Sequence, residues 1–477
     1  MIEQERAIRP GITESLGVQG WSHLDPILLA ALATESPLLL VGAHGTAKSL
    51  LVEKIANALS LSLRHYNASL INYDDLVGIP LPEAGTNRLQ FVTTPGAIWE
   101  AEFVFFDEIS RCRPDLQNKM FPIVHERRIA GIHLDKLRHR WAAMNPPAPE
   151  DPDTAIGEYY LGSEPLDPAL IDRFPFVVPV PAWKHLSKAD RRRLVSWDNL
   201  PSSATSLDSL SEQIDACVVL IPKIEDSLHD WLSDYVVSVV DLLEQSHLPQ
   251  SPRRAYMLAR SLVAVQAARM VIEGEEADLQ SSAELALTFG LPQSATEVPP
   301  SRTSVIAIHR QAWEISALSE DDDWRKVLEE IDSAQRVVLA DELDMADVDI
   351  SRLITQALGG EPSEARRVGL ATAMFIAYHQ RRDLSASAWE PLANLAMRVL
   401  EPRQMSLALR PGPMTDLWNE INQWIPSIEE VESRVTRLER NFILMGFPDL
   451  WLRLDWKEAL GQFRADLDLF KVEDLSA

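Results

Sequence analysis

The chain has little of several features that mark whole classes of protein. Its 477 residues include two cysteines, Cys112 and Cys217, which are too few for a metal cluster and need not pair in a reducing compartment. No apolar run approaches the ~20 residues that cross a bilayer. The N-terminal stretch MIEQERAIRPGITES is charged and lacks an apolar targeting core. We therefore expect a cytoplasmic protein with no membrane partner.

Basic residues are also scarce, with 45 Lys and Arg against 71 Asp and Glu and a formal net charge of −26. Nucleic-acid-binding proteins usually show a basic face, so this balance weighs against a nucleic-acid partner. It does not exclude one, because an assembly can hide a local basic pore. A solvated helix face is the simpler explanation for the best candidate patch, which consists of Lys184, Lys188, Arg191, Arg192 and Arg193.

The most informative segment is PLLLVGAHGTAKSLLVEKI, residues 37–55. Leu38 to Val41 are apolar without alternation, as in a strand buried on both faces of a parallel sheet. A glycine-containing loop and a helix follow, which predicts a loop whose N–H groups hold the phosphates of a nucleotide. The residues assigned to nucleotide binding are Gly42, Ala43, His44, Gly45, Thr46, Ala47, Lys48, Ser49 and Leu50.

Two side chains of this loop have distinct predicted roles. Lys48 would reach the terminal phosphates and Ser49 a Mg²⁺ ion. One residue departs from the usual pattern, because Ala47 stands where glycine normally precedes the lysine. Taken alone, the segment is also compatible with an ordinary strand-to-helix turn that carries a surface lysine.

Two acids end the next buried-strand pattern, Phe103 to Phe106. A parallel strand delivers such residues to the carboxyl edge of the sheet. We predict that Asp107 binds the Mg²⁺, mostly through water, and that Glu108 polarises the water that attacks the γ-phosphate. A solvated acidic turn is the alternative, and the loop upstream makes it the weaker one.

Three further polar residues complete the candidate catalytic set. Asn145 follows a strand-like run ending at Met144 and is expected beside the two acids, where an amide can orient water. Arg173 follows a short helix and is either an ion-paired surface arginine or a group offered to a neighbour's nucleotide. Arg253 lies in the first turn of a helix begun by Ser251 and Pro252, and could point back at the phosphates.

The segments GAHGTAKS, FVFFDEIS, WAAMNPP, LDPALIDRF and SPRRAYMLA resemble, in order and spacing, the MoxR-like branch of the AAA+ ATPases, which is related to magnesium-chelatase and dynein-type modules. The resemblance covers roughly residues 10–290, and five ordered motifs are far more specific than one. Alanine before the loop lysine is frequent in that branch. The resemblance implies ATP and Mg²⁺ as cofactors, Asn145 as first sensor, Arg173 as arginine finger and Arg253 as second sensor.

An arginine supplied by a neighbour makes sense only in an oligomer, so the resemblance also implies a homo-oligomeric ring, most simply a hexamer. Members of this branch often work with a protein that carries a von Willebrand factor A domain. One Asp-x-Ser-x-Ser run, Asp383 to Ser387, does occur in this chain, but it lies among the helically spaced segments of the extension and not in an α/β domain of that kind. We therefore expect a separate partner of that kind, or another client protein, which the ring would remodel, activate or assemble.

The predicted fold class is α/β, with a P-loop AAA+ core built on a parallel sheet, a helical lid and a helical C-terminal extension. We place the core at residues 1–198, the lid at 199–292 and the extension at 293–477. Insert hairpins are expected between Asn67 and Trp99 and around residues 128–133, facing either a pore or a partner, or merely solvent.

The extension shows helical spacing throughout. It contains an acidic stretch from Ser319 to Asp349 and all seven tryptophans that follow Trp231. It is a probable partner-binding region, although aromatic residues at this spacing are more often core. Two rival functions stay open. One is a nucleic-acid-directed motor of a defence or restriction complex, and the other is a non-hydrolysing nucleotide-gated scaffold.

Overall fold

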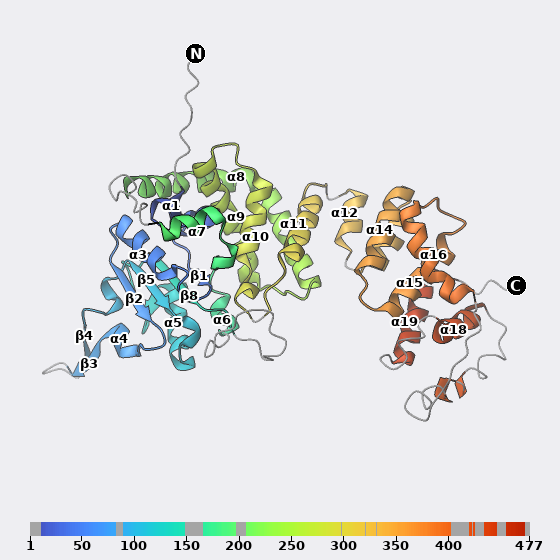
Figure 1. Cartoon of the computed structure of the whole chain (residues 1–477), viewed down its shortest axis with the longest axis horizontal. Helices are drawn as coiled ribbons and strands as arrows, with labels where there is room; N and C mark the ends of the chain where they lie inside the picture. The colour runs from blue at the N-terminus through green and yellow to red at the C-terminus, as the bar shows by residue number, and fades with distance from the viewer. Residues whose placement is uncertain are drawn as a thin grey trace, which may run out of the picture. The chain divides into compact units, whose positions relative to one another are not determined.

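The computed structural model describes residues 11–82, 89–147, 166–196, 207–296, 298–319, 321–330, 332–401, 419–421, 423–424, 434–445 and 455–472. The chain divides into two compact units, Met1–Ala317 and Leu318–Ala477 (Figure 1). We describe each unit by itself.

A five-stranded parallel sheet forms the centre of the first unit, in the order β2-β5-β8-β1-β9. The strands are β1 (Leu38–Val41), β2 (Leu63–Asn67), β5 (Phe103–Asp107), β8 (His139–Met144) and β9 (Phe176–Pro179). All four residues of β1 are buried, because β1 has a strand on each side and helices cover the sheet. The predicted α/β class with a parallel sheet is confirmed.

Helices surround this sheet and connect its strands, as parallel pairing requires. They are α1 (Ile12–Ser15), η1 (Ser22–Leu24), α2 (Asp25–Ala33), α3 (Lys48–Ala58), α4 (Tyr73–Val77), η2 (Ile98–Glu100), η3 (Ile109–Arg111), α5 (Pro114–Glu126), α6 (Pro168–Ile171), η5 (Trp183–His185) and α7 (Lys188–Val195). One apolar core lies between the sheet and α5, where Phe106 and Ala142 meet Met120 and Ile123.

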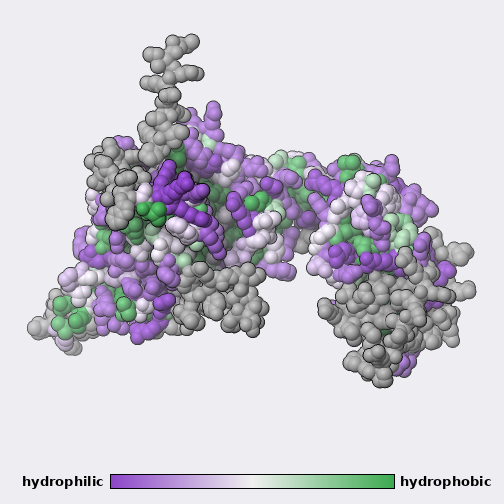
Figure 2. Space-filling view, viewed as in Figure 1, coloured by the Kyte–Doolittle hydropathy of each residue, from purple (hydrophilic) through white to green (hydrophobic). Residues whose placement is uncertain are grey.

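Two antiparallel hairpins extend from this layer. The first pairs β3 (Ile79–Pro82) with β4 (Leu89–Val92), and the second pairs β6 (Arg128–Ile129) with β7 (Ile132–His133). Both predicted hairpins are confirmed. Ile79, Leu81 and Val92 are exposed on the first one, which appears as a hydrophobic cluster at the lower left of Figure 2.

The lid consists of long helices, α8 (Leu207–Gln245), α9 (Pro252–Glu273) and α10 (Leu279–Gly290), followed by η6 (Pro292–Ala295) and α11 (Arg302–Ser316). The first of them, α8, is one helix of 39 residues with Pro222 inside it. The predicted start of α9 is confirmed, since the Ser251 hydroxyl accepts the backbone N–H of Arg254 at 3.1 Å.

Helix α11 packs against α8, although the sequence assigned its residues to the extension. The Tyr235 hydroxyl lies 2.8 Å from Nδ1 of His309, and the rings of Trp231 and Trp313 meet edge to face with centroids 4.9 Å apart. The first compact unit therefore continues to Ala317, beyond the boundary predicted at 292/293.

Helix α9 is long and apolar enough, by length and composition, to cross a membrane. A core helix of a globular unit meets the same criterion, and half of the relevant window of α9 is buried inside the protein. Its partners are α8, α10 and α2. The apolar character of α9 is thus explained by packing inside the first unit.

The described part of the second unit is helical. It contains α12 (Asp323–Glu329), α13 (Ser333–Glu342), α14 (Asp347–Gly360), α15 (Glu364–Tyr378), α16 (Ala386–Leu400), α18 (Arg434–Met445) and α19 (Trp456–Leu469). Helix α13 is separate from α12 because Asp332 caps its start by accepting the N–H groups of Ala334 and Gln335 at 2.8 and 3.1 Å.

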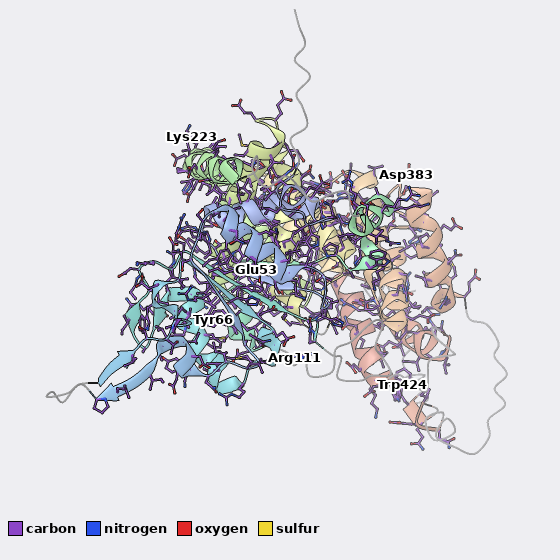
Figure 3. All side chains as sticks on the ribbon, turned by 60° about the vertical axis from the view of Figure 1, so that its left-hand side comes forward. Glu53, Tyr66, Arg111, Lys223, Asp383 and Trp424 are labelled. Atoms are coloured by element: carbon purple, nitrogen blue, oxygen red, sulfur yellow. The ribbon has the colours of Figure 1, made fainter. Side chains whose placement is uncertain are left out.

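The tryptophans of this unit belong to its core as far as they are described. Trp324, Trp389, Trp424 and Trp456 all pack into one apolar cluster, and Trp424 is labelled in Figure 3. The core interpretation is therefore confirmed for these four side chains, while Trp418 and Trp451 lie outside the described residues. Part of the acidic stretch is structural too, since Asp322 caps α12 by accepting the N–H of Trp324 at 2.8 Å.

Candidate functional site

The loop between β1 and α3 wraps tightly, and two of its residues have left-handed backbone. Gly45 has φ +73°, and Ala47, just before α3, has φ +70° and ψ +17°. This conformation explains why glycine usually precedes the lysine in such loops, since a side chain there is strained. Gly42 is needed for a different reason, because a Cβ on it would lie 2.3 Å from Cγ2 of Val180.

Lys48 lies inside this loop, with only 7% of its surface exposed. Its Nζ donates to the carbonyl oxygens of Gly42 at 2.6 Å and Ala43 at 2.7 Å. Burial lowers its pKa to about 8, against the opposing effect of the Asp107 and Glu108 carboxylates. A positive group held within a curl of backbone N–H groups is the arrangement that anionic phosphates favour.

Ser49 and Asp107, the two predicted metal ligands, are in direct contact. The Ser49 hydroxyl donates to Oδ2 of Asp107 at 2.6 Å, and Oδ1 accepts the Glu108 N–H at 2.9 Å. Burial alone would raise the pKa of Asp107, but hydrogen bonds from His65 and Ser49 outweigh it and the pKa is lowered. Hydroxyl and carboxylate oxygens suit Mg²⁺, so this pair fits that ion.

A histidine that the sequence did not predict for this site also contacts the Asp107 carboxylate. His65, on β2, places Nε2 3.4 Å from Oδ2 of Asp107 and Nδ1 3.6 Å from Oε1 of Glu53 on α3. The hydrogen bond with Asp107 is the main reason why the pKa of His65 is raised. Glu53 is labelled in Figure 3. No local pattern marks these residues, because their proximity depends on β2 lying beside β5.

Glu108 is about one-third exposed and has φ +54°. Its Oε2 lies 3.5 Å from the Ser69 hydroxyl and 3.9 Å from Nη1 of Arg111. The Ser69 hydroxyl also donates to the Asn67 amide oxygen at 2.6 Å. A carboxylate reachable by solvent at the strand tip can act on a water molecule.

Asn145 is buried at the end of β8. Strand β8 lies between β5 and β1, and the N–H of Gly42 donates to the carbonyl of Met144 at 3.0 Å. The structure thus gathers the phosphate-binding loop, the two acids and Asn145 at one edge of the sheet, the carboxyl edge. Within the described ranges, no group of three or more His, Cys, Asp and Glu side chains forms a protein-only metal site.

Arg173 lies at the opposite, amino edge. It precedes β9, whose first residue Phe176 is in register with Leu38 at the start of β1. The four residues of β1 span about 13 Å before the phosphate-binding loop begins. The Arg173 guanidinium contacts the carbonyl of Ala169 and lies 4.6 Å from the ring centroid of Phe121. It is therefore remote from Lys48 along the strand direction.

Arg253 lies with Arg173 rather than with Lys48. Its Nη1 is 3.4 Å from Oδ2 of Asp172, the neighbour of Arg173 in the chain. The sequence did not single out Arg254, which is only 2% exposed and donates to the carbonyl of Phe174 at 2.6 Å. Arg254 thus fixes α9 to the α6–β9 junction and leaves Arg253 exposed.

A comparison with family models supports this fold. A family model described as AAA domain (dynein-related subfamily) matches residues 37–174. A solved structure from Cytophaga hutchinsonii ATCC 33406, described as a "putative ATPase", is 19% identical with a TM-score of 0.45, and the alignment covers 63% of this chain and 92% of that one. No curated protein matches. Residues 37–174 therefore carry an AAA-type nucleotide-binding fold, of the dynein-related kind.

Proposed function

We propose that this chain is a MoxR-like AAA+ ATPase that hydrolyses ATP with Mg²⁺ in a homo-oligomeric ring, most simply a hexamer. The observation that carries the proposal is the division of the predicted catalytic residues between two edges of one sheet. Lys48, Asp107 and Glu108 lie at the carboxyl edge, whereas Arg173 lies at the amino edge. Such a divided site is complete only when the amino edge of one copy meets the carboxyl edge of the next.

Each residue has a role that follows from its position. The loop N–H groups and Lys48 bind the phosphates, and Ser49 and Asp107 hold the Mg²⁺, which neutralises charge on the phosphoryl oxygens when bound. Glu108 accepts a proton from the attacking water, and Asn145 orients that water. The neighbour's Arg173 and Arg253 stabilise negative charge that develops on the transferred phosphoryl group.

The use of this activity is proposed to be remodelling of a separate protein, such as one with a von Willebrand factor A domain. The exposed apolar side chains of the β3–β4 hairpin, Ile79, Leu81 and Val92, support a contact role for it. The alternative is a nucleic-acid-directed motor. The exposed basic residues of α7, among them Arg192 and Arg193, are its main support, and stimulation of turnover by DNA or RNA would favour it.

The decisive experiment mixes two inactive variants. Arg173→Ala should lower turnover by about 10³-fold or more, and Lys48→Ala should abolish nucleotide binding. In an equimolar mixture, about one interface in four pairs an intact loop with an intact Arg173, so about a quarter of wild-type turnover should return. Arg310→Ala, an exposed change on α11, is the control and should be neutral. Proven subunit mixing without recovery would refute action between copies.

A further inference from the structure

A second group of charged side chains surrounds a cavity of about 350 Å³ at the amino edge of the sheet. Its wall combines the segment before β1, the end of α5, the start of β8, the residues before β9 and the middle of α9. The titratable side chains on this wall are Glu35, His125, Arg127, Arg140, Arg173, Tyr256 and Arg260. Four guanidinium groups thus accompany one carboxylate, in a chain whose formal net charge is −26.

The single carboxylate is already engaged. Glu35 accepts from Nη2 of Arg127 and from Nε of Arg138, each at 2.8 Å. Arg140 is only 5% exposed and is held by backbone carbonyls, including those of Glu35 at 2.8 Å and Val124 at 3.1 Å. The wall residues Arg127 and Arg140, together with Arg138, which does not line the cavity, therefore place three positive charges around the single negative charge of Glu35.

Arg173 and Arg260 are bound differently. Among the residues that the structure describes, neither forms an ion pair with a carboxylate. Arg173 contacts the carbonyl of Ala169 and the face of Phe121, and Arg260 donates from Nη1 to the Tyr256 hydroxyl at 2.8 Å. A guanidinium has five N–H donors, so both retain donors for an anion.

The position of Arg260 on α9 relates it to the other arginines of this edge. Arg253, Tyr256 and Arg260 follow each other at spacings of three and four residues, which places them on one face of the helix. Arg260 lies about 10 Å along the helix axis from Arg253. Helix α9 therefore presents two arginines, two turns apart, on the side where Arg173 is located.

We propose that Arg260 acts with Arg173 and Arg253 as a further cationic contact for the terminal phosphates of a nucleotide bound to a neighbouring copy of the chain. This inference rests on the proposed function. Guanidinium forks match the oxygens of a phosphoryl group. The cavity is at the small end of ligand sites, which span about 300–1,000 Å³, and so suits phosphoryl groups rather than a whole nucleotide. Arg127 and Arg140 add a fixed positive field behind them.

The test begins with Arg260→Ala in the full chain. Turnover at saturating ATP should fall by about tenfold or more, while affinity for trinitrophenyl-ATP stays unchanged, because each copy keeps its own loop. Arg260→Lys should recover only part of the loss, since lysine keeps the charge but not the fork. The control is Arg310→Ala, an exposed change on α11. A purely structural role for Arg260 predicts instead loss of assembly and of nucleotide affinity together.

Mixing then identifies the copy on which Arg260 acts. Arg260→Ala combined with Lys48→Ala should regain turnover, because the intact loop of one variant faces the intact Arg260 of the other. No recovery despite mixing would overturn the inference. Inorganic phosphate tests whether the cavity binds a free phosphate ion instead of the phosphates of a neighbour's nucleotide. If phosphate protects Lys48→Ala against heat, but not the double variant Lys48→Ala/Arg260→Ala, and turnover of Arg260→Ala is normal, the cavity serves a free anion and the inference fails.

Different results would overturn the proposed function and the role of Arg260. Absence of turnover in the wild-type chain, or normal turnover in Arg173→Ala, would remove the proposed function itself. Loss of turnover in Arg173→Ala together with normal turnover in Arg260→Ala would leave that function intact and remove the role of Arg260 alone.

Discussion

Replacing Ala47 by glycine is expected to stabilise the first unit, contrary to the usual effect of glycine near a helix. Ala47 has φ +70° and ψ +17°, and a left-handed conformation costs a residue with a Cβ roughly 1–2 kcal/mol. Glycine relieves that strain, but it also raises the conformational entropy of the unfolded chain, which lowers the gain in stability by about 0.4–1 kcal/mol. The net expectation is a gain of about 0.5–1 kcal/mol in the free energy of unfolding.

The matched control is Ala56→Gly, which makes the same chemical change inside α3. Ala56 is buried in the helix, so glycine there should cost about 1 kcal/mol or more. Urea unfolding gives both free energies, and hydrogen exchange of peptides from β1 and α3 reports the first unit alone. ATP affinity should be unchanged in Ala47→Gly. Destabilisation of the same sign in both variants would refute the argument from backbone strain.

Two further changes test other parts of the molecule. Glu108→Gln should preserve ATP binding but lower turnover about 10²-fold or more, because the amide keeps the shape of the side chain and cannot accept the proton of water. Turnover is measured by phosphate release, with Glu126→Gln at the exposed end of α5 as the control. Normal turnover in Glu108→Gln would contradict the role of Glu108. In the second unit, burial raises the pKa of Asp466 to about 6, so its contribution to stability is greatest below pH ~4 and is lost as the pH rises from ~4 to ~6, by at most about 3 kcal/mol. Asp466→Asn should remove that loss of stability, whereas Asp468→Asn, an exposed change nearby, should not. If the free energy of unfolding depends on pH in the same way in the wild type and in Asp466→Asn, ionisation of Asp466 does not destabilise the fold and the prediction is wrong.

Local sequence rules were sufficient where structure depends on neighbouring residues. The unalternating run Leu38–Val41 and the run ending at Asp107 became buried parallel strands, because such runs can be satisfied only with covered faces. Ser251 capped α9 as predicted, since a cap needs only its own hydroxyl and an N–H three residues on. The order of the motifs along the chain then indicated the nucleotide-binding fold.

Other features depended on contacts between distant segments. The pairing of β2 with β5 brought His65 to Asp107, and no spacing in the sequence predicts this contact. The packing of α9 determined that Arg254 is buried and that Arg253 faces out, although the two arginines are adjacent and chemically identical. Helix α8 runs through Pro222 because packing against α9 and α11 outweighs the local cost of proline.

The sequence by itself therefore predicted which residues would bind phosphate, hold a divalent cation and act on water, because the residue types for that chemistry lie in short runs such as the one from Gly42 to Ser49. Only the tertiary structure decided that Arg173 and Arg260 share a cavity at the far edge of the sheet. The physical reason is the common direction of the parallel strands. Parallel strands all deliver their carboxyl ends to one edge, so residues that precede a strand are carried to the other.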